Sequence, residues 1–166
     1  MPRGDEIVPV LNRYMKEFES AKALLIATRD WHPSNHASFK PYGGIWPVHC
    51  VQNTPGAEFH PKLSLSKNVM IISKGTEEKK EAYSGFDETN LTKILKKNGV
   101  RIVWVGGLAT DYCVKSTVLD GIKAGFRVTF LADASRGVDL NAGDSEKAIT
   151  EMLAAGAEKA TLADLE

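Results

Sequence analysis

The chain has 166 residues, 43% of them hydrophobic, which suits one globular domain with its own core. Lys plus Arg and Asp plus Glu both number 21, and this zero net charge argues against nucleic acid or an anionic membrane as partner. No apolar run approaches the roughly 20 residues of a membrane span, and no signal peptide is evident. We expect one cytoplasmic domain over residues 1–166, with Cys50 and Cys113 reduced.

The first sixty residues contain a predicted helix, a predicted strand and a long irregular segment. Asp5 can cap a helix in which apolar residues recur at helical spacing as far as Phe18. The continuous apolar run 23–27 predicts a buried strand. Residues 28–61 are rich in Pro, Gly, His, Asn and aromatic side chains, and irregular segments of this length in compact domains are usually functional.

Strands and helices continue to alternate in the rest of the chain. The expected elements are two buried strands at 68–73 and 102–105, helices at 90–97, 111–124 and 144–155, a strand at 126–132 and a weak edge strand at 161–165. This alternation predicts an α/β domain with a mainly parallel sheet. Unlike most doubly wound domains, the chain begins with a helix and not with a strand.

Chemically active side chains follow three of the predicted strands. Asp30, His32 and His36 come after the first strand, Lys74 after the second and Cys113 after the third. In open α/β sheets, ligands bind outside the carboxyl ends of the strands. The sequence therefore predicts that a candidate metal-ligand set, a lysine and a thiol share one rim of the sheet.

The histidines of the irregular segment are candidate metal ligands. Asp30 and His32 are two residues apart, so on an extended chain their side chains point the same way, and His49 could complete the set. Two imidazoles and a carboxylate suit Zn²⁺, Fe²⁺ or Mn²⁺. The alternative is that these are ordinary loop histidines. His36 is a weaker candidate that fits better behind the ligands, and we favour a structural role for Cys50.

Cys113 lies in the first turn of a predicted helix, just past a strand. Backbone N–H groups and the helix dipole stabilise a thiolate there, and the ammonium of Lys74 would lower the thiol pKa from roughly 8.5. The alternatives are a small buried apolar cysteine and an exposed lysine at a strand end. Trp31, Trp46 and Tyr83 either pack in the core or sandwich a flat ring.

Five stretches of the chain resemble one known family. Residues 27–33, 46–59, 72–75, 82–86 and 107–114 are similar, in this order, to the nicotinamidases (pyrazinamidases) of the isochorismatase-like cysteine hydrolases. The resemblance implies a three-layer α/β/α fold of Rossmann type. It also implies hydrolysis of nicotinamide to nicotinate and ammonia in NAD salvage, with pyrazinamide as a second possible substrate, by a monomer or homodimer.

The resemblance also implies catalytic roles. Cys113 corresponds to the nucleophile that forms a thioester, and Lys74 to the lysine of the catalytic triad. The bond between Leu108 and Ala109 corresponds to a cis peptide, and the N–H groups of Ala109 and Cys113 to the oxyanion hole.

The remaining implied roles concern the metal and the substrate ring. Asp30, His32 and His49 correspond to the ligands of one divalent ion, zinc first, with iron or manganese as alternatives. Trp46, Tyr83 and Ala109 correspond to residues that contact the substrate.

The chain departs from this family at its beginning. The family opens with a central strand that ends in an aspartate, the general base, and residues 1–5 match the end of the loop after it. Without that strand, a slot in the sheet stays unpaired and no carboxylate takes the thiol proton at the family's position. We expect the 166-residue chain to be poorly stable and nearly inactive.

Two other functions remain open. One is a catalytically impaired relative that binds a nicotinamide-like ligand or a protein partner. The other is an isochorismatase-type hydrolase with a different small substrate, against which the Asp30, His32 and His49 set and the stretch 46–49 argue.

Overall fold

The computed structural model describes residues 3–165, so residues 1, 2 and 166 of the expected domain lie outside the described range. The helices are α1 (Val8–Ser20), α2 (Leu91–Lys97), α3 (Lys115–Lys123) and α4 (Asp144–Ala154). The strands are β1 (Ile26–Asp30), β2 (Met70–Lys74), β3 (Ile102–Leu108), β4 (Arg127–Arg136) and β5 (Glu158–Ala160). The mixed α/β architecture with parallel strands confirms the predicted fold class.

The last predicted strand is wrong. Strand β5 lies before residues 161–165, and Leu162–Leu165 form a 3-10 turn. The cause is local, because the Asp164 carboxylate accepts hydrogen bonds from both the N–H and the hydroxyl of Thr161 and so turns the chain. The N–H of Leu162 then donates to the Asp133 carboxylate at 2.9 Å, which anchors the turn to β4.

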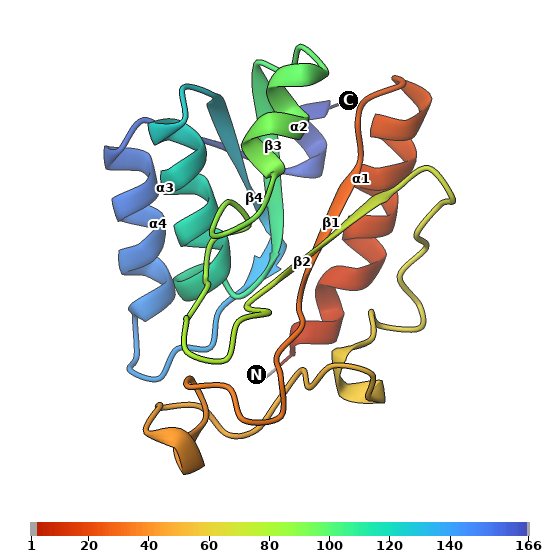
Figure 1. Ribbon diagram of the computed structural model, residues 1–166. Helices are drawn as coiled ribbons and strands as arrows, with labels where there is room; N and C mark the ends of the chain where they lie inside the picture. The colour runs from red at the N-terminus through yellow and green to blue at the C-terminus, as the bar shows by residue number, and fades with distance from the viewer. Residues whose placement is uncertain (1–2, 166) are drawn as a thin grey trace.

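Helices cover both faces of the strands (Figure 1). On one face, α1 packs against β3 and β4, where the Phe18 and Trp104 ring centres are 5.4 Å apart and the Tyr14 hydroxyl donates to Asp133 at 2.9 Å. On the other face, Val118 of α3 and Met152 of α4 belong to the main core cluster. None of the helices within residues 3–165 is long and apolar enough to span a membrane.

The strands form two separate sheets. In the first, β1 pairs in parallel with β2, and Asp30 stands opposite Lys74. In the second, the parallel order is β3-β4-β5. Within residues 3–165 no ladder joins β1 to β3, so each of these strands has an edge without a strand partner.

Burial follows this division of the sheet. Val128, Phe130 and Leu131 of the middle strand β4 are buried, whereas Ile102 and Leu108 at the ends of β3 are 44% and 42% exposed. The predicted strands at 23–27, 68–73 and 102–105 exist with shifted ends, but their predicted burial is wrong, since Met70 and Ile71 of β2 are also 38% and 50% exposed. Within residues 3–165, no strand covers the facing edges of β1 and β3.

A cavity of about 1500 Å³ occupies the space between β1 and β3. Val8 and Leu11 of α1 line one side, Leu91 of α2 lines another, and Asp30 and Cys113 also line it. The gap therefore reaches the rim where the predicted site lies.

The backbone direction shows which groups face this cavity. Leu25 accepts a hydrogen bond from Met70 and Arg101 accepts one from Arg127, so these residues face β2 and β4, respectively. In a parallel strand, alternate residues direct their N–H and C=O groups to opposite sides. Thr28 and Trp104 therefore direct their backbone groups into the cavity.

We predict fast hydrogen exchange at this edge. The Thr28 and Trp104 amides should exchange faster than those of Ala27 and Val103, which lie in the same strands but face the paired side. NMR-detected exchange provides this comparison within each strand. Equal protection of Thr28, Trp104 and the central Phe130 would contradict the split sheet.

Candidate active site

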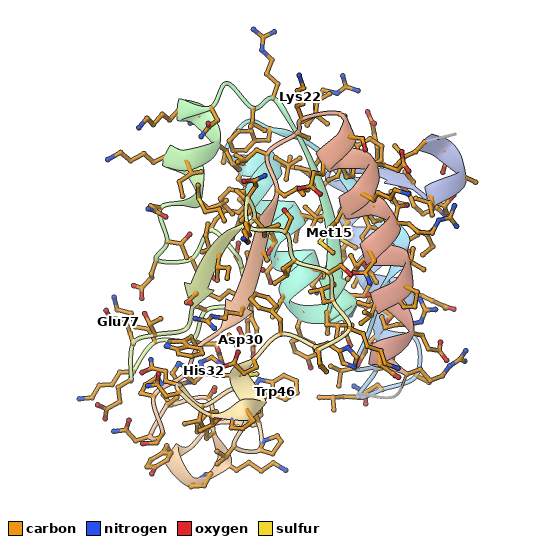
Figure 2. All side chains as sticks on the ribbon, turned by 90° about the vertical axis from the view of Figure 1, so that its right-hand side faces the viewer. Met15, Lys22, Asp30, His32, Trp46 and Glu77 are labelled. Atoms are coloured by element: carbon orange, nitrogen blue, oxygen red, sulfur yellow. The ribbon has the colours of Figure 1, made fainter. Side chains whose placement is uncertain are left out.

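The predicted site lies at the carboxyl ends of β1, β2 and β3. Figure 2 shows Asp30, His32 and Trp46 gathered at the lower end of β1 and β2, where the long segment 31–69 begins. The structure brings the three strand ends together as predicted, although β3 belongs to the other sheet.

Lys74, at the end of β2, contacts residues at the end of β1 and after the end of β3 through one buried ammonium group. Its side chain is 4% exposed, and Nζ donates to Asp30 Oδ1 at 2.5 Å, to the Ala82 carbonyl at 2.8 Å and to Cys113 Sγ at 3.4 Å. The contact with Asp30 follows from the β1–β2 register. The reading of Lys74 as an exposed strand-end lysine is therefore wrong.

The charges of this group are set by burial and by the neighbours. Burial lowers the pKa of Lys74, but Cys113 and Asp30 outweigh it, so the pKa is raised and the ammonium persists. Burial raises the pKa of Cys113, while the Lys74 ammonium and the Ala109 N–H oppose this effect without cancelling it. The predicted lowering by Lys74 is present, but the net pKa of the thiol lies above its ordinary value.

The segment before α3 places the thiol. The peptide between Leu108 and Ala109 is cis, as the family resemblance implied. Thr110–Val114 then form a π-helical turn, which the sequence pattern did not distinguish from an ordinary first helical turn. The Asp111 carboxylate accepts the N–H groups of Val138 and Asp139 at 2.9 and 2.8 Å, so it anchors this turn and does not reach the thiol as a base.

Asp30, His32 and His49 form a group that fits a metal ion. One potential ligand atom from each lies within 4.8 Å of the others. His32 and His49 use Nδ1 to bond the carbonyls of Gly75 and Pro47, both at 2.8 Å, which leaves Nε2 for a metal. Burial lowers the pKa of His32, which favours the neutral imidazole that a metal requires.

Gly75 is a site residue that the sequence reading missed. Its φ is +61°, and a Cβ there would lie 2.5 Å from Cε1 of His32. The signal was its position after Lys74, but the need for glycine becomes visible only when His32 is placed against it.

The other histidines and Cys50 lie outside this group. His36 is fully buried and makes protein hydrogen bonds through both ring nitrogens. His60 accepts the N–H of Lys62 in an exposed turn. Burial raises the pKa of Cys50 to about 11, and its carbonyl accepts the His32 N–H at 2.9 Å.

Aromatic side chains stand beside the metal-ligand group. Trp46 Nε1 donates to the Tyr83 hydroxyl at 2.9 Å, and the Trp46 and Tyr112 ring centres are 4.8 Å apart. Tyr112 was missed, although it directly precedes Cys113. Trp31 is not part of this cluster, since the Arg29 guanidinium lies 3.7 Å from its ring centre.

The fold and the site together define a class: an α/β domain with a cysteine, a lysine and a potential metal-ligand set on one rim. The isochorismatase domain matches residues 1–164, and the chain belongs to this family.

Known proteins show the same relationship. The chain is 39% identical over 187 aligned residues to the nicotinamidase of Escherichia coli, covering 100% of this chain and 88% of the relative. It is 51% identical to the crystallised pyrazinamidase of Pyrococcus horikoshii in complex with zinc, with a TM-score of 0.93 and coverage of 98% and 88%. The yeast nicotinamidase bound to the inhibitor nicotinaldehyde is 26% identical, with a TM-score of 0.89 and coverage of 97% and 90%.

We predict that Gly75→Ala weakens zinc binding more than tenfold, because the new methyl group would displace His32. Competition with a chelator measures the dissociation constant. Gly99→Ala is the matched control, since Gly99 also has a positive φ, +68°, but no atom near its Cβ position. Equal losses of zinc affinity in the two variants would show that backbone strain, and not displacement of His32, causes the effect.

We predict that Lys74→Met raises the pKa of Cys113 further, because the thiolate loses its neighbouring ammonium. The pH dependence of iodoacetamide labelling, in a Cys50→Ser background, should shift upward, with slower labelling at pH 8. Lys79→Met, at an exposed lysine, is the control and should leave the profile unchanged. A downward shift would show that Lys74 does not stabilise the thiolate.

Proposed function

We propose that this chain is a metal-dependent cysteine amidase that hydrolyses nicotinamide to nicotinate and ammonia in NAD salvage. The observation that carries the proposal is the convergence of Cys113, Lys74 and the potential metal-ligand group on one rim. The nicotinamidase and pyrazinamidase relatives support the same substrate class. The alternatives of a pure binding protein and of another small substrate are not favoured.

Cys113 is the nucleophile in the proposed reaction. Its sulfur attacks the carboxamide carbon, the C–N bond breaks, and ammonia leaves behind a thioester that water hydrolyses to nicotinate. The N–H groups of Ala109 and Cys113 would bind the oxyanion. Lys74 Nζ and the Ala109 N–H both act as donors toward the sulfur, so neither accepts the thiol proton. We therefore expect slow acylation of Cys113 in the 166-residue chain.

Asp30, His32 and His49 would hold the metal. When bound, the ion supplies a cationic partner for the ring nitrogen of the substrate. We propose zinc, which the related Pyrococcus horikoshii pyrazinamidase binds in its crystal structure, with iron and manganese as the other ions that suit this ligand set.

Trp46 and Tyr83 would bind the ring. Their hydrogen bond fixes two aromatic faces beside His49, whose ring centre is 6.4 Å from that of Trp46. Pyrazinamide carries its carboxamide on a similar flat ring and would occupy the same place. We further propose that residues 1–166 act as one domain in the cytoplasm, with nicotinamide as its small-molecule partner.

An aldehyde probe tests the thiol and the ring site together. We expect nicotinaldehyde to protect Cys113 of the zinc-loaded chain from iodoacetamide, because the thiol adds reversibly to the aldehyde carbon. Benzaldehyde, which lacks the ring nitrogen, should protect at least tenfold less. Equal protection by the two aldehydes would contradict the proposed contact between ring nitrogen and metal.

A single-turnover measurement tests the reaction. With the chain in excess over nicotinamide, ammonia release should depend on Cys113, and Cys113→Ala should release none while still binding nicotinate. Undiminished ammonia release by Cys113→Ala would overturn the proposed nucleophile.

A further inference from the structure

His36 is a fully buried ring whose hydrogen bonds determine its chemical state. Nδ1 accepts the backbone N–H of Ser38 at 3.2 Å, and the Ser38 hydroxyl lies 2.7 Å from the same atom. Nε2 lies 2.9 Å from the Lys80 carbonyl, which can only accept. The proton therefore sits on Nε2, and the lone pair on Nδ1 points at Ser38. No lone pair of this ring remains for a metal ion.

The same ring supports a metal-ligand residue. The His36 and His32 ring centres are 4.2 Å apart at an interplanar angle of 28°, so the rings are stacked. At the Nδ1–Cε1 edge of its ring, His32 contacts Gly75, whose carbonyl accepts its Nδ1 proton. His32 is thus held by His36 at one ring face and by Gly75 at one ring edge, and both contacts restrict the direction of its Nε2.

His36 also joins two loops that carry site residues. It lies between His32 and His49 in sequence, and its bond to the Lys80 carbonyl reaches the loop that leads to Ala82 and Tyr83. The Ala37 N–H donates to the Glu78 carbonyl at 2.8 Å and forms a second link between these loops. The Ala82 carbonyl in turn accepts a hydrogen bond from Lys74.

We propose that His36 is a positioning residue, and not a metal ligand, of the metal centre. It holds the His32 imidazole by stacking, and its hydrogen bond to the Lys80 carbonyl joins the two loops. This inference rests on the proposed function, since it assumes that Asp30, His32 and His49 bind the ion.

X-ray absorption of the zinc-loaded chain tests the ligand count. We expect two imidazoles on zinc in the parent and two in His36→Phe, which keeps an aromatic ring against His32. Three imidazoles in the parent, or the loss of one in the variant, overturns the inference alone. A parent chain that binds no zinc overturns the proposed metal centre and, with it, the inference.

Zinc affinity tests the positioning role. We expect the dissociation constant to rise about 10- to 100-fold in His36→Ala, with one zinc per folded chain retained, and less in His36→Gln, which can still donate to the Lys80 carbonyl. His60→Ala, at an exposed histidine outside the group, is the control and should bind zinc as the parent does. An unchanged affinity in His36→Ala overturns the role.

The metal-free parent provides a test that needs no variant. Long-range proton–nitrogen NMR correlations should show His36 as the neutral tautomer protonated at Nε2. A proton on Nδ1 would overturn the hydrogen-bond assignment from which the inference starts.

Discussion

The buried ammonium of Lys74 is the interaction on which the site depends. A buried charge is costly unless it is paired and hydrogen-bonded, and Lys74 meets this requirement with a carboxylate, a carbonyl and a thiol. Each partner comes from a different segment: Asp30 from β1, Ala82 from the loop after β2, and Cys113 from the turn before α3. Satisfying one cation therefore fixes three parts of the site relative to one another.

This contact also crosses the division of the sheet. Strands β1 and β3 share no ladder within residues 3–165, so the two sheets are held together by helices and side chains. Ile72 of β2 and Val118 of α3 belong to the same buried cluster, which provides the apolar part of this link. The contact between Lys74 and Cys113 provides the polar part, and it borders a cavity of about 1500 Å³.

Much of the site could be predicted from the sequence because its residues directly follow the predicted strands. A run such as 102–105 predicts a strand, and the residues after a parallel strand lie at a common rim, which is how Lys74 and Cys113 could be associated from 39 positions apart. The division of the strands into two sheets could not be predicted in this way. Apolar residues are typical of buried strands, but whether a neighbour covers β3 depends on pairing across the whole sheet.

The less predictable details are those that depend on what a side chain touches. Asp-x-His spacing indicates metal ligands, but His36 lies in the same segment and could also be a ligand by residue type. Only its hydrogen bonds to Ser38 and Lys80 show that both of its ring nitrogens already have protein partners. The thiol pKa is a similar case. The sequence predicts a cationic neighbour for Cys113, yet the sign of the net shift depends on how far burial outweighs Lys74. A protonated resting thiol means that the site must remove a proton before the sulfur can attack, and the ammonium that stabilises the resulting thiolate cannot itself accept that proton.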